Sequence, residues 1–442
     1  MNQYLVKPAE RRFRFAFENT GLTRLHFSPV SFKVGMFLLL VATGTAFPLT
    51  SHRIVVAKDG SGDFTTLTQA ISSLPMFNYQ RVVIFIKNGV YNEKVRITQD
   101  YVTLEGESRD STIIEYDQLR TDWISHKDAI GPAVINIHAD DVVLKNLTVE
   151  NTQPQIGPHA FAVYDNGTRT IFLNCNLLSN GGDTVSPWNY KTGMYYFSNC
   201  TFRGSVDCVC PRGWCFIDHS RFDELKKGST AIWHAGGFNI NQKFVIENST
   251  FDGVKGFELG RHHYEAQFYL LNCTFSKNMA DTPIYRVTYK DSTKDRPFNW
   301  GERDYYYNCH RDGGNYSWFS NNLKSAAGSP SHASITPAWT FDNRWNPVST
   351  KGPTVVKFEV EESRLLLFFK EPITVTGTPV LVSKNGSQFT YVDGAGSSTL
   401  RFESPSRISQ GDLAGLTLGQ GGKLFGTVAS VQRRDVDLEK GI

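Results

Sequence analysis

Three charged residues are spaced so that they could form one reaction centre. Asp183 and Asp207 lie 24 positions apart, and Arg261 follows in the sequence FELGRHH. Two close carboxyl groups do not both ionise easily, so the pKa of one rises, while a bidentate arginine keeps the other ionised. Such a set can supply one nucleophile and one proton donor. The alternative is that both aspartates are chain corners and Arg261 is a surface cation, and the spacing alone leaves both interpretations open.

A repeated strand pattern surrounds these three residues. Each copy is a short alternating run rich in Phe, Tyr, Ile and Val that ends in Asn and small polar residues, which indicates one strand and its corner. The copies are IFLNCNL (171–177), MYYFSNCTF (194–202), GWCFIDHSRF (213–222), KFVIENSTF (243–251) and QFYLLNCTF (267–275).

The intervals between the copies indicate how they stack. From the second copy onward, the final phenylalanines follow one another at 20, 29 and 24 residues. Irregular repeats of this length are typical of a parallel β-helix, in which each coil buries its apolar face only against its neighbours. Equivalent points on adjacent coils then lie about 4.8 Å apart. We therefore expect Asp183 and Asp207 on neighbouring coils, with Arg261 able to reach them from a later one.

Composition is typical of a large, β-rich protein. The chain has 442 residues, enough for two domains, with 13% aromatic residues and 37 glycines. The net charge is only +3, and no Lys/Arg cluster is present that could follow a phosphate backbone. Nucleic acid is therefore not expected as a partner.

Residues 1–50 are predicted to be an N-terminal extension with a secretory signal. The only long apolar run, Val34–Ala46, follows Lys33 and ends in small residues. It is too short and too interrupted to be a stable membrane span. We expect a secreted protein, extracellular or periplasmic, whose true start lies near Met36. An uncleaved membrane anchor is the alternative.

The cysteines and the N-x-T sequences have structural explanations. Cys208, Cys210 and Cys215 lack the paired spacing of a zinc site, so no metal is expected, and any disulfide among the seven cysteines stays unassigned. Four cysteines follow an Asn of the repeat and are expected to stack inward: Cys175, Cys200, Cys273 and Cys309. The N-x-T sequences recur at the same point of each repeat, which favours stacked corners over glycosylation acceptors: Asn146, Asn199, Asn248 and Asn272.

Several motifs occur in an order that resembles a known family. Residues 54–71, IVVAKDGSGDFTTLTQAI, predict a strand, a Gly-rich turn and an amphipathic helix that covers the open end of a solenoid. Together with GVYNEKV, GESRDSTII, VENT, Asp183-Thr184, GSVD (204–207) and LGR (259–261), this order resembles the pectin methylesterases. These are carbohydrate esterases built on a right-handed parallel β-helix. The resemblance covers residues 54–275, roughly half of the chain.

The resemblance implies a role for each of the three charged residues. Asp207 corresponds to the nucleophile of the family, Asp183 to its general acid/base, and Arg261 to the arginine that orients the nucleophile. Asp207 would attack the methyl-ester carbonyl of a galacturonate unit, and Asp183 would protonate the departing methanol and then accept a proton from water. No metal or organic cofactor is required. The implied partner is an acidic, plant-type polysaccharide, pectin or homogalacturonan.

The sequence departs from the family close to the predicted site. The family has glutamines that stabilise the oxyanion at the positions of Gly182 and His159, and an aromatic residue at the position of His263. Loss of one oxyanion donor costs about 10²–10³ in rate. Either His159 or another group supplies the donor, or the protein is not an efficient pectin methylesterase. The clustering of these changes favours an altered substrate.

Aromatic residues and histidines near the acidic pair are candidates for substrate binding. Four of them are expected to contact the sugar: His159, Trp188, Trp233 and His263. Trp214 and Tyr264 also fall in these corners, and His234 and His262 are adjacent. For each tryptophan, packing of a corner is an equally good explanation, and for each histidine a packing or hydrogen-bonding role is favoured.

The expected organisation is all-β, with two folded domains. Residues 51–345 form the parallel β-helix, and a Ser/Pro/Gly-rich passage separates it from residues 353–442, where short alternating strands predict a small immunoglobulin-like β-sandwich. We expect a monomer. Two other functions compete with the esterase: a polysaccharide lyase, which also uses this fold, and a non-catalytic polysaccharide-binding protein.

Overall fold

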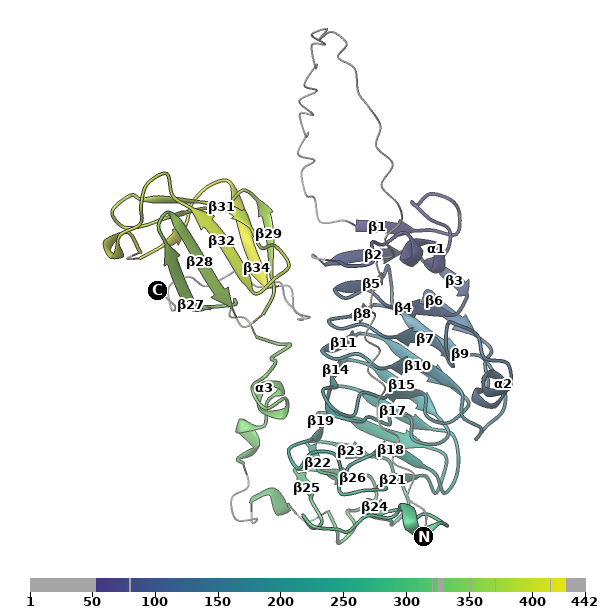
Figure 1. Ribbon diagram of the computed structural model, residues 1–442. Coiled ribbons are helices and arrows are strands. Elements are labelled where there is room, and N and C mark those ends of the chain that lie inside the picture. The colour runs from purple at the N-terminus through teal and green to yellow at the C-terminus, as the bar shows by residue number, and fades with distance from the viewer. Residues whose placement is uncertain are drawn as a thin grey trace, which may run out of the picture. The chain divides into compact units, whose positions relative to one another are not determined.

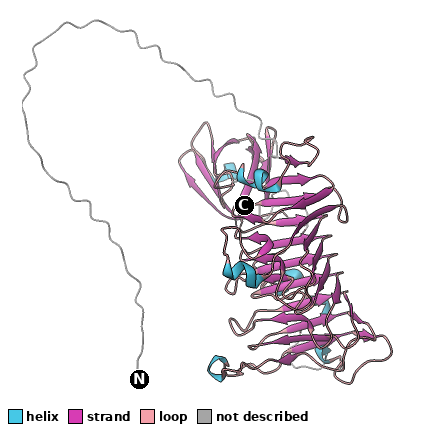
Figure 2. Cartoon of the chain, turned by 90° about the vertical axis from the view of Figure 1, so that its right-hand side faces the viewer, coloured by secondary structure: helices cyan, strands magenta, loops and turns pink. Residues whose placement is uncertain are grey.

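The computed structural model describes residues 53–78, 81–319, 321–324, 330–349, 352–369, 371–413 and 415–426. Strands dominate these residues and the helices are few and short (Figure 2). In this part of the chain no helix combines the length and apolar character needed to cross a bilayer. The extension and signal predicted for residues 1–50 lie outside the described residues.

The first long sheet of the β-helix, sheet A, is parallel and joins ten described strands (Figure 1). In spatial order these are β1 (Arg53–Val56), β2 (Val82–Ile86), β5 (Val102–Gly106), β8 (Val143–Lys145), β11 (Thr170–Leu173), β14 (Met194–Ser198), β16 (Trp214–Asp218), β19 (Phe244–Glu247), β22 (Phe268–Leu271) and β25 (Asp304–Tyr307).

The second long sheet, sheet B, joins nine described strands, one from each successive coil. They are β3 (Gly89–Asn92), β6 (Thr112–Tyr116), β9 (Thr148–Asn151), β12 (Asn176–Ser179), β15 (Thr201–Gly204), β17 (Arg221–Glu224), β20 (Thr250–Gly253), β23 (Thr274–Phe275) and β26 (His310–Arg311).

The third face of the β-helix is interrupted. One part pairs β4 (Val95–Ile97), β7 (Ala133–Ile137), β10 (Phe161–Asp165) and β13 (Val185–Pro187), and the other pairs β18 (Thr230–His234), β21 (Glu258–His262) and β24 (Tyr285–Arg286). Only single bridges through Val209, to Val185 and to Ile232, join the two parts. The coil that carries Asp207 therefore has no regular strand on this face, which leaves its backbone free to form a corner.

Side-chain ladders hold the coils in register. Phe202, Phe222, Phe251 and Phe275 are paired from strand to strand in sheet B, and their ring centroids are 4.9, 4.3 and 5.2 Å apart. The predicted stacking of successive coils in a parallel β-helix is confirmed. Each ring covers the one below, so the apolar interior is continuous through the coils and depends on all of them.

A second ladder consists of asparagines at the corners where the chain turns from sheet A to sheet B. Asn174, Asn199, Asn248 and Asn272 all have positive φ, which Asn tolerates better than most residues. The amide of Asn174 donates to Asn146, that of Asn199 to Asn174 and that of Asn272 to Asn248, at 3.0, 2.9 and 3.2 Å. The predicted stacking of the N-x-T corners is confirmed. All seven cysteines are buried and free, and the four that follow a corner Asn line the inner core.

The described helices are all short, and α1 covers one end of the β-helix. Helix α1 (Leu67–Ser72) buries Leu67, Ala70 and Ile71, as its amphipathic pattern predicts, and Thr66 caps it by accepting the N–H of Gln69. The other described helices are α2 (Arg120–Ser125), α3 (Pro337–Thr340) and the 3₁₀ turns η1 (Ser292–Lys294), η2 (Asn322–Lys324), η3 (His332–Ser334) and η4 (Gln410–Leu413).

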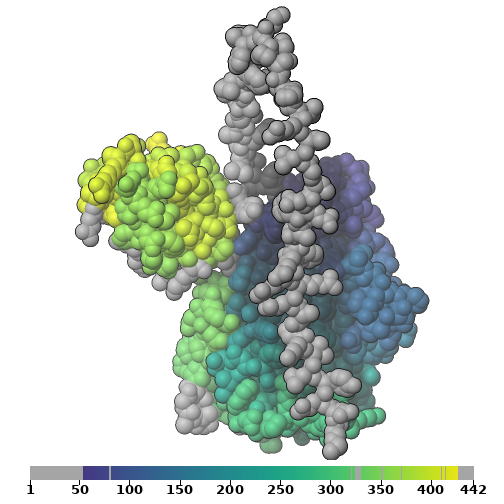
Figure 3. Space-filling model, viewed as in Figure 1, coloured from purple at the N-terminus to yellow at the C-terminus, as the bar shows by residue number. Residues whose placement is uncertain are grey.

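After the last coil, the segment 330–349 packs on the outer face of sheet A. Phe341 and Trp345 are buried there against outward side chains of the sheet, including Tyr196 and Trp214. Figure 3 shows the green surface of this segment against the teal surface of the β-helix.

The remaining described residues form antiparallel strands with their own core. One sheet has the order β27 (Val355–Glu361), β28 (Arg364–Phe369), β32 (Thr399–Glu403), β31 (Gln388–Asp393), β30 (Val380–Val382) and β33 (Thr417–Leu418), and a second pairs β29 (Ile373–Gly377) with β34 (Gly422–Gly426). Leu365, Leu367, Phe389 and Phe402 are fully buried in that core. The strands lie where the alternating sequence places them, and the immunoglobulin-like sandwich stays a prediction.

Candidate functional site

The two aspartates occupy equivalent corners of adjacent coils. Gly182 forms a parallel bridge with Val206. Asp183 and Asp207 are the next residues of the two coils, so they lie at equivalent positions. Both have positive φ, 56° and 53°, a conformation that aspartate tolerates better than most residues. The N–H of Asp183 donates to the carbonyl of Val206, and the N–H of Asp207 donates to that of Thr230. The backbone thus places each carboxyl on the same face, one coil apart.

Arg261 holds Asp207 with two hydrogen bonds. Its Nε and a terminal nitrogen donate to the two carboxyl oxygens of Asp207 at 3.1 and 2.6 Å. Arg261 comes from β21, three coils beyond Asp183 and two beyond Asp207, and it is paired with Trp233 of β18. The hydroxyl of Thr230, the first residue of β18, donates to Asp207 at 2.5 Å. Three donors therefore fix the orientation of one carboxyl group.

The buried position of Asp207 opposes its ionisation. Its side chain is only 5% exposed, and its pKa is raised to about 6. Burial is the main cause and the negative charge of Asp183 adds to it, while Arg261 and Thr230 act in the opposite direction. A carboxyl with this pKa is still about 90% ionised at pH 7. Asp207 is therefore a carboxylate near neutral pH that water scarcely reaches.

Asp183 has a different environment. Its side chain is 13% exposed, and its Oδ1 lies 3.6 Å from Nε2 of His159. His159 is 44% exposed and bridges Gly182 from the preceding coil. Asp183 therefore faces solvent and an imidazole, whereas Asp207 faces a guanidinium and a hydroxyl. The two carboxyl groups are chemically identical but differ in surroundings, which is what separate acid and nucleophile roles require.

A side chain at position 182 would be in tight contact with its neighbours. A Cβ added there would lie 3.0 Å from Cβ of Val206 and 3.2 Å from the ring of His159. A larger residue would therefore need these neighbours to shift slightly. His159 is the nearest side chain that could donate a hydrogen bond in place of a glutamine at position 182.

The structure gives the predicted sugar-binding residues different degrees of access. Trp188 and His263 are partly exposed, whereas Trp233 is only 8% exposed and its indole N–H donates to Nδ1 of His263 at 2.8 Å. Trp214 packs on the outer face of sheet A and is not brought to this site. Trp233 therefore has little ring surface left to offer a sugar.

Sequence reasoning missed Arg212. Its guanidinium lies between the rings of Trp188 and Trp233, 3.9 and 4.5 Å from their centroids, and donates to the carbonyl of Cys210 at 2.9 Å. Burial opposes its charge, but nearby groups that include Asp183 raise its pKa above the ordinary value. The turn CPRG carries no pattern that would have predicted this position. Arg212 occupies one side of both tryptophans, so it braces the aromatic wall of the site.

Two further histidines have structural roles. His234 is 1% exposed, accepts the N–H of Gly236 and lies 2.9 Å from the carbonyl of Gly213, and burial lowers its pKa to about 4. His262 is equally buried and contacts the carbonyl of Tyr264. Among the residues that the structure describes, no group of three or more His, Cys, Asp or Glu side chains is arranged to hold a metal ion.

A second buried carboxyl group lies behind the site. Glu224, at the end of β17, is fully buried, and its Oε2 lies 3.5 Å from the thiol of Cys208, the residue after Asp207. Burial raises the pKa of Glu224 to about 8, although the N–H of Lys226 donates to its other oxygen. Near neutral pH the folded protein therefore holds a proton that the unfolded chain releases at its ordinary pKa of 4.5.

Replacing Glu224 by Gln is expected to stabilise the protein at alkaline pH. Because the pKa of Glu224 is raised in the folded state, this group contributes its full stabilisation below pH 4.5. The contribution is lost as the pH rises through 8. Gln keeps the shape of the side chain but does not titrate. The decrease in the free energy of unfolding from pH 5 to pH 8 should therefore be about 2–4 kcal/mol smaller in the variant than in the original chain. Denaturant unfolding at both pH values measures this difference.

The exposed Asp117 provides the matched control, since Asp117→Asn should leave the pH dependence unchanged. If Glu224→Gln loses stability with pH as steeply as the original chain, Glu224 is not the buried acid that we describe.

Comparison with known proteins identifies relatives of this arrangement. Residues 53–247 match the family model named Pectinesterase. Pectinesterase 31 of Arabidopsis thaliana is 27% identical over 38% of this chain and 55% of its own length, and Pectinesterase 4 is 30% identical over 44% of this chain and 34% of its own. Across four curated Arabidopsis relatives, the chain spans between 27% and 55% of their length.

Solved structures agree on the fold. Pectin methylesterase PemA from Erwinia chrysanthemi is 22% identical with a TM-score of 0.51, covering 68% of this chain and 99% of that one. The carrot pectin methylesterase is 20% identical with a TM-score of 0.50, covering 62% of this chain and 86% of its own. A further pectin methylesterase structure, 23% identical, was solved in complex with a hexasaccharide. These likenesses support a right-handed parallel β-helix, as predicted.

Proposed function

Residues 53–247 of this chain belong to the pectinesterase family, and from this premise we propose that the protein hydrolyses methyl esters of pectin or of a related acidic polysaccharide. The observation that carries the proposal is the bidentate contact between Arg261 and Asp207 beside a second, differently solvated carboxyl on the adjacent coil. Binding to a polysaccharide alone would not need a buried carboxylate held by three donors.

The proposed reaction has two steps. In the first, a carboxylate oxygen of Asp207 attacks the ester carbonyl carbon, the bond from that carbon to the methoxy oxygen breaks, and Asp183 gives its proton to the departing methanol. In the second, Asp183 takes a proton from water, the hydroxide attacks the acyl group, and Asp207 leaves as a carboxylate. The products are methanol and a free sugar carboxylate, and no redox partner is needed.

The chain itself supplies the remaining functions of the site. Arg261 and Thr230 keep Asp207 ionised and oriented, and Arg212 holds the aromatic wall formed by Trp188 and Trp233. Trp188 and His263 are partly exposed rings that could contact the sugar. We propose a secreted monomer that acts on the polysaccharide outside the cell, in keeping with the predicted signal in residues 1–50.

One set of assays separates this function from its competitors. Methanol release from methylated pectin is the expected result. Unsaturated products that absorb in the ultraviolet would instead identify a lyase. Pectin binding without either product would identify a binding protein, which is the alternative that the Gly182 and His159 departures favour.

Replacing His159 by Ala tests whether its imidazole is the oxyanion donor. Because position 182 carries no glutamine and the imidazole of His159 lies beside Asp183, we expect kcat for methanol release to fall about 10²–10³-fold with little change in KM. His219→Ala, at a corner between sheets A and B where the side chain is 65% exposed, should leave kcat unchanged. An unchanged kcat in His159→Ala would remove the imidazole from the mechanism.

A further inference from the structure

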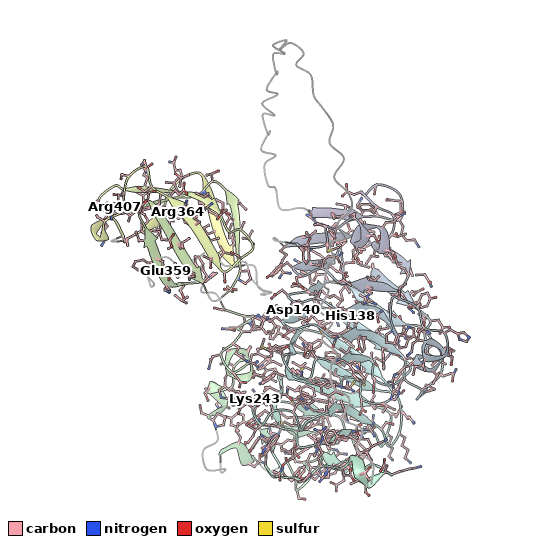
Figure 4. The ribbon with its side chains drawn as sticks, in the orientation of Figure 1. His138, Asp140, Lys243, Glu359, Arg364 and Arg407 are labelled. Carbon is pink, nitrogen blue, oxygen red and sulfur yellow. The ribbon has the colours of Figure 1, made fainter. Side chains whose placement is uncertain are left out.

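A cavity separate from the aspartate site lies on the outer face of sheet A. Its volume is about 500 Å³, within the range of small-molecule sites. The floor is Trp214 of β16, one wall is the loop before β19, and the other wall is the segment that follows α3. None of the residues that line it belongs to the proposed catalytic group, and Figure 4 labels one of them, Lys243.

The cavity carries more positive than negative charge. Lys243 and Arg344 both contact Asp342, at 2.5 and 3.6 Å, and among the residues that the structure describes no other acidic side chain lines the cavity. Burial lowers the pKa of both cations below their ordinary values, and Arg344 and Arg303 lower that of Lys243 further. Two cations that share one carboxylate leave one positive charge without a full counter-ion. A second anion would therefore bind favourably here.

An aromatic ring lies beneath the cations of the cavity. Trp214 is 2% exposed, and its indole N–H has no hydrogen-bond partner among the described residues. The guanidinium of Arg344 lies 3.9 Å from the ring centroid of Trp214 and is itself 40% exposed, so its outer edge faces the open side of the cavity.

We infer that this cavity binds a single carboxylated sugar unit, a uronate, apart from the aspartate site. The carboxylate pairs with Arg344 and Lys243, and the ring hydroxyls contact Asn241 and Asn343 on the rim. The cavity is larger than a simple inorganic anion needs, and the side chain of Trp339, 4.7 Å from the Lys243 ammonium, offers a partly exposed ring. The choice of a uronate rests on the proposed function, but the anion site does not.

Calorimetric titration of the full chain tests the site with three probes: unesterified galacturonate, neutral galactose and sulfate. We expect galacturonate to bind, galactose to bind at least tenfold more weakly, and sulfate to compete with galacturonate. Arg344→Gln should weaken galacturonate binding at least tenfold, and Arg344→Lys should retain most of it. Asn241→Asp, a change at an exposed rim residue that leaves the packing intact, should weaken binding by adding a like charge.

Two controls separate this site from the aspartate site. Arg261→Gln should leave the cavity affinity for galacturonate unchanged, and Arg344→Gln should leave methanol release from short esters unchanged. Galactose binding as tightly as galacturonate would overturn the inference. So would unchanged galacturonate affinity in both Arg344→Gln and Asn241→Asp, or binding of sulfate without galacturonate. Loss of methanol release in the original chain would contradict the proposed function but not this site.

Discussion

Replacing Asp207 by Asn is expected to lower kcat for methanol release by at least about 10⁴-fold while the β-helix stays folded. An amide of the same size can accept hydrogen bonds from Thr230 and Arg261, but it cannot act as the attacking oxygen. Asn also carries no charge, so the variant avoids the cost of burying a carboxylate, which is the main cause of the raised pKa of Asp207. Activity should therefore be lost without loss of stability, as measured by initial rates and thermal unfolding.

The matched control is Asp223→Asn. Asp223 is also a partly buried aspartate in an ion pair with an arginine, Arg221, at 2.6 Å, but it belongs to sheet B. Its replacement should change kcat by less than threefold. Methanol release within tenfold of the original rate in Asp207→Asn would reject Asp207 as the nucleophile, whatever the stability of the variant.

The periodic parts of the molecule could be predicted from the sequence. A residue that recurs once per coil must stack on its copies, so the spacing of the phenylalanines and corner asparagines was sufficient to place them. The same logic put Asp183 and Asp207 one coil apart, and their neighbours Gly182 and Val206 do pair. Position along the coil follows from counting residues, because each coil repeats the same cross-section.

The parts that break the repeat could not be predicted in this way. The sequence pattern fades after Phe275, yet β25 and β26 add a further coil, because DYYY and HR pair through their backbone and need no apolar alternation. The placement of Arg212 between two tryptophans and the burial of Glu224 depend on how side chains fill one particular coil. No count of residues along the chain predicts such contacts.

The second large effect is expected from replacing Arg261 by Gln. The pKa of Asp207 is about 6, and this value already includes the lowering effect of Arg261. Without the guanidinium the pKa should rise above neutrality, so the nucleophile is mostly protonated at pH 6–7 and ionises only at higher pH. We expect kcat/KM to fall about 10²–10³-fold at pH 6 and much less at pH 9, which shifts the acidic limb of the pH profile upward.

The shape of that pH profile distinguishes a role in ionisation from a role in packing. Arg203→Gln is the control, because Arg203 forms a similar partly exposed ion pair with Glu150, at 2.7 Å, on the neighbouring sheet B. It should change neither limb of the profile. Arg261→Lys keeps the charge but not the paired donors, so it should restore the acidic limb while kcat stays low. If Arg261→Gln lowers the rate equally at every pH, the arginine does not act by keeping Asp207 ionised. The proposal that Asp207 is an ionised nucleophile would then lose its electrostatic support.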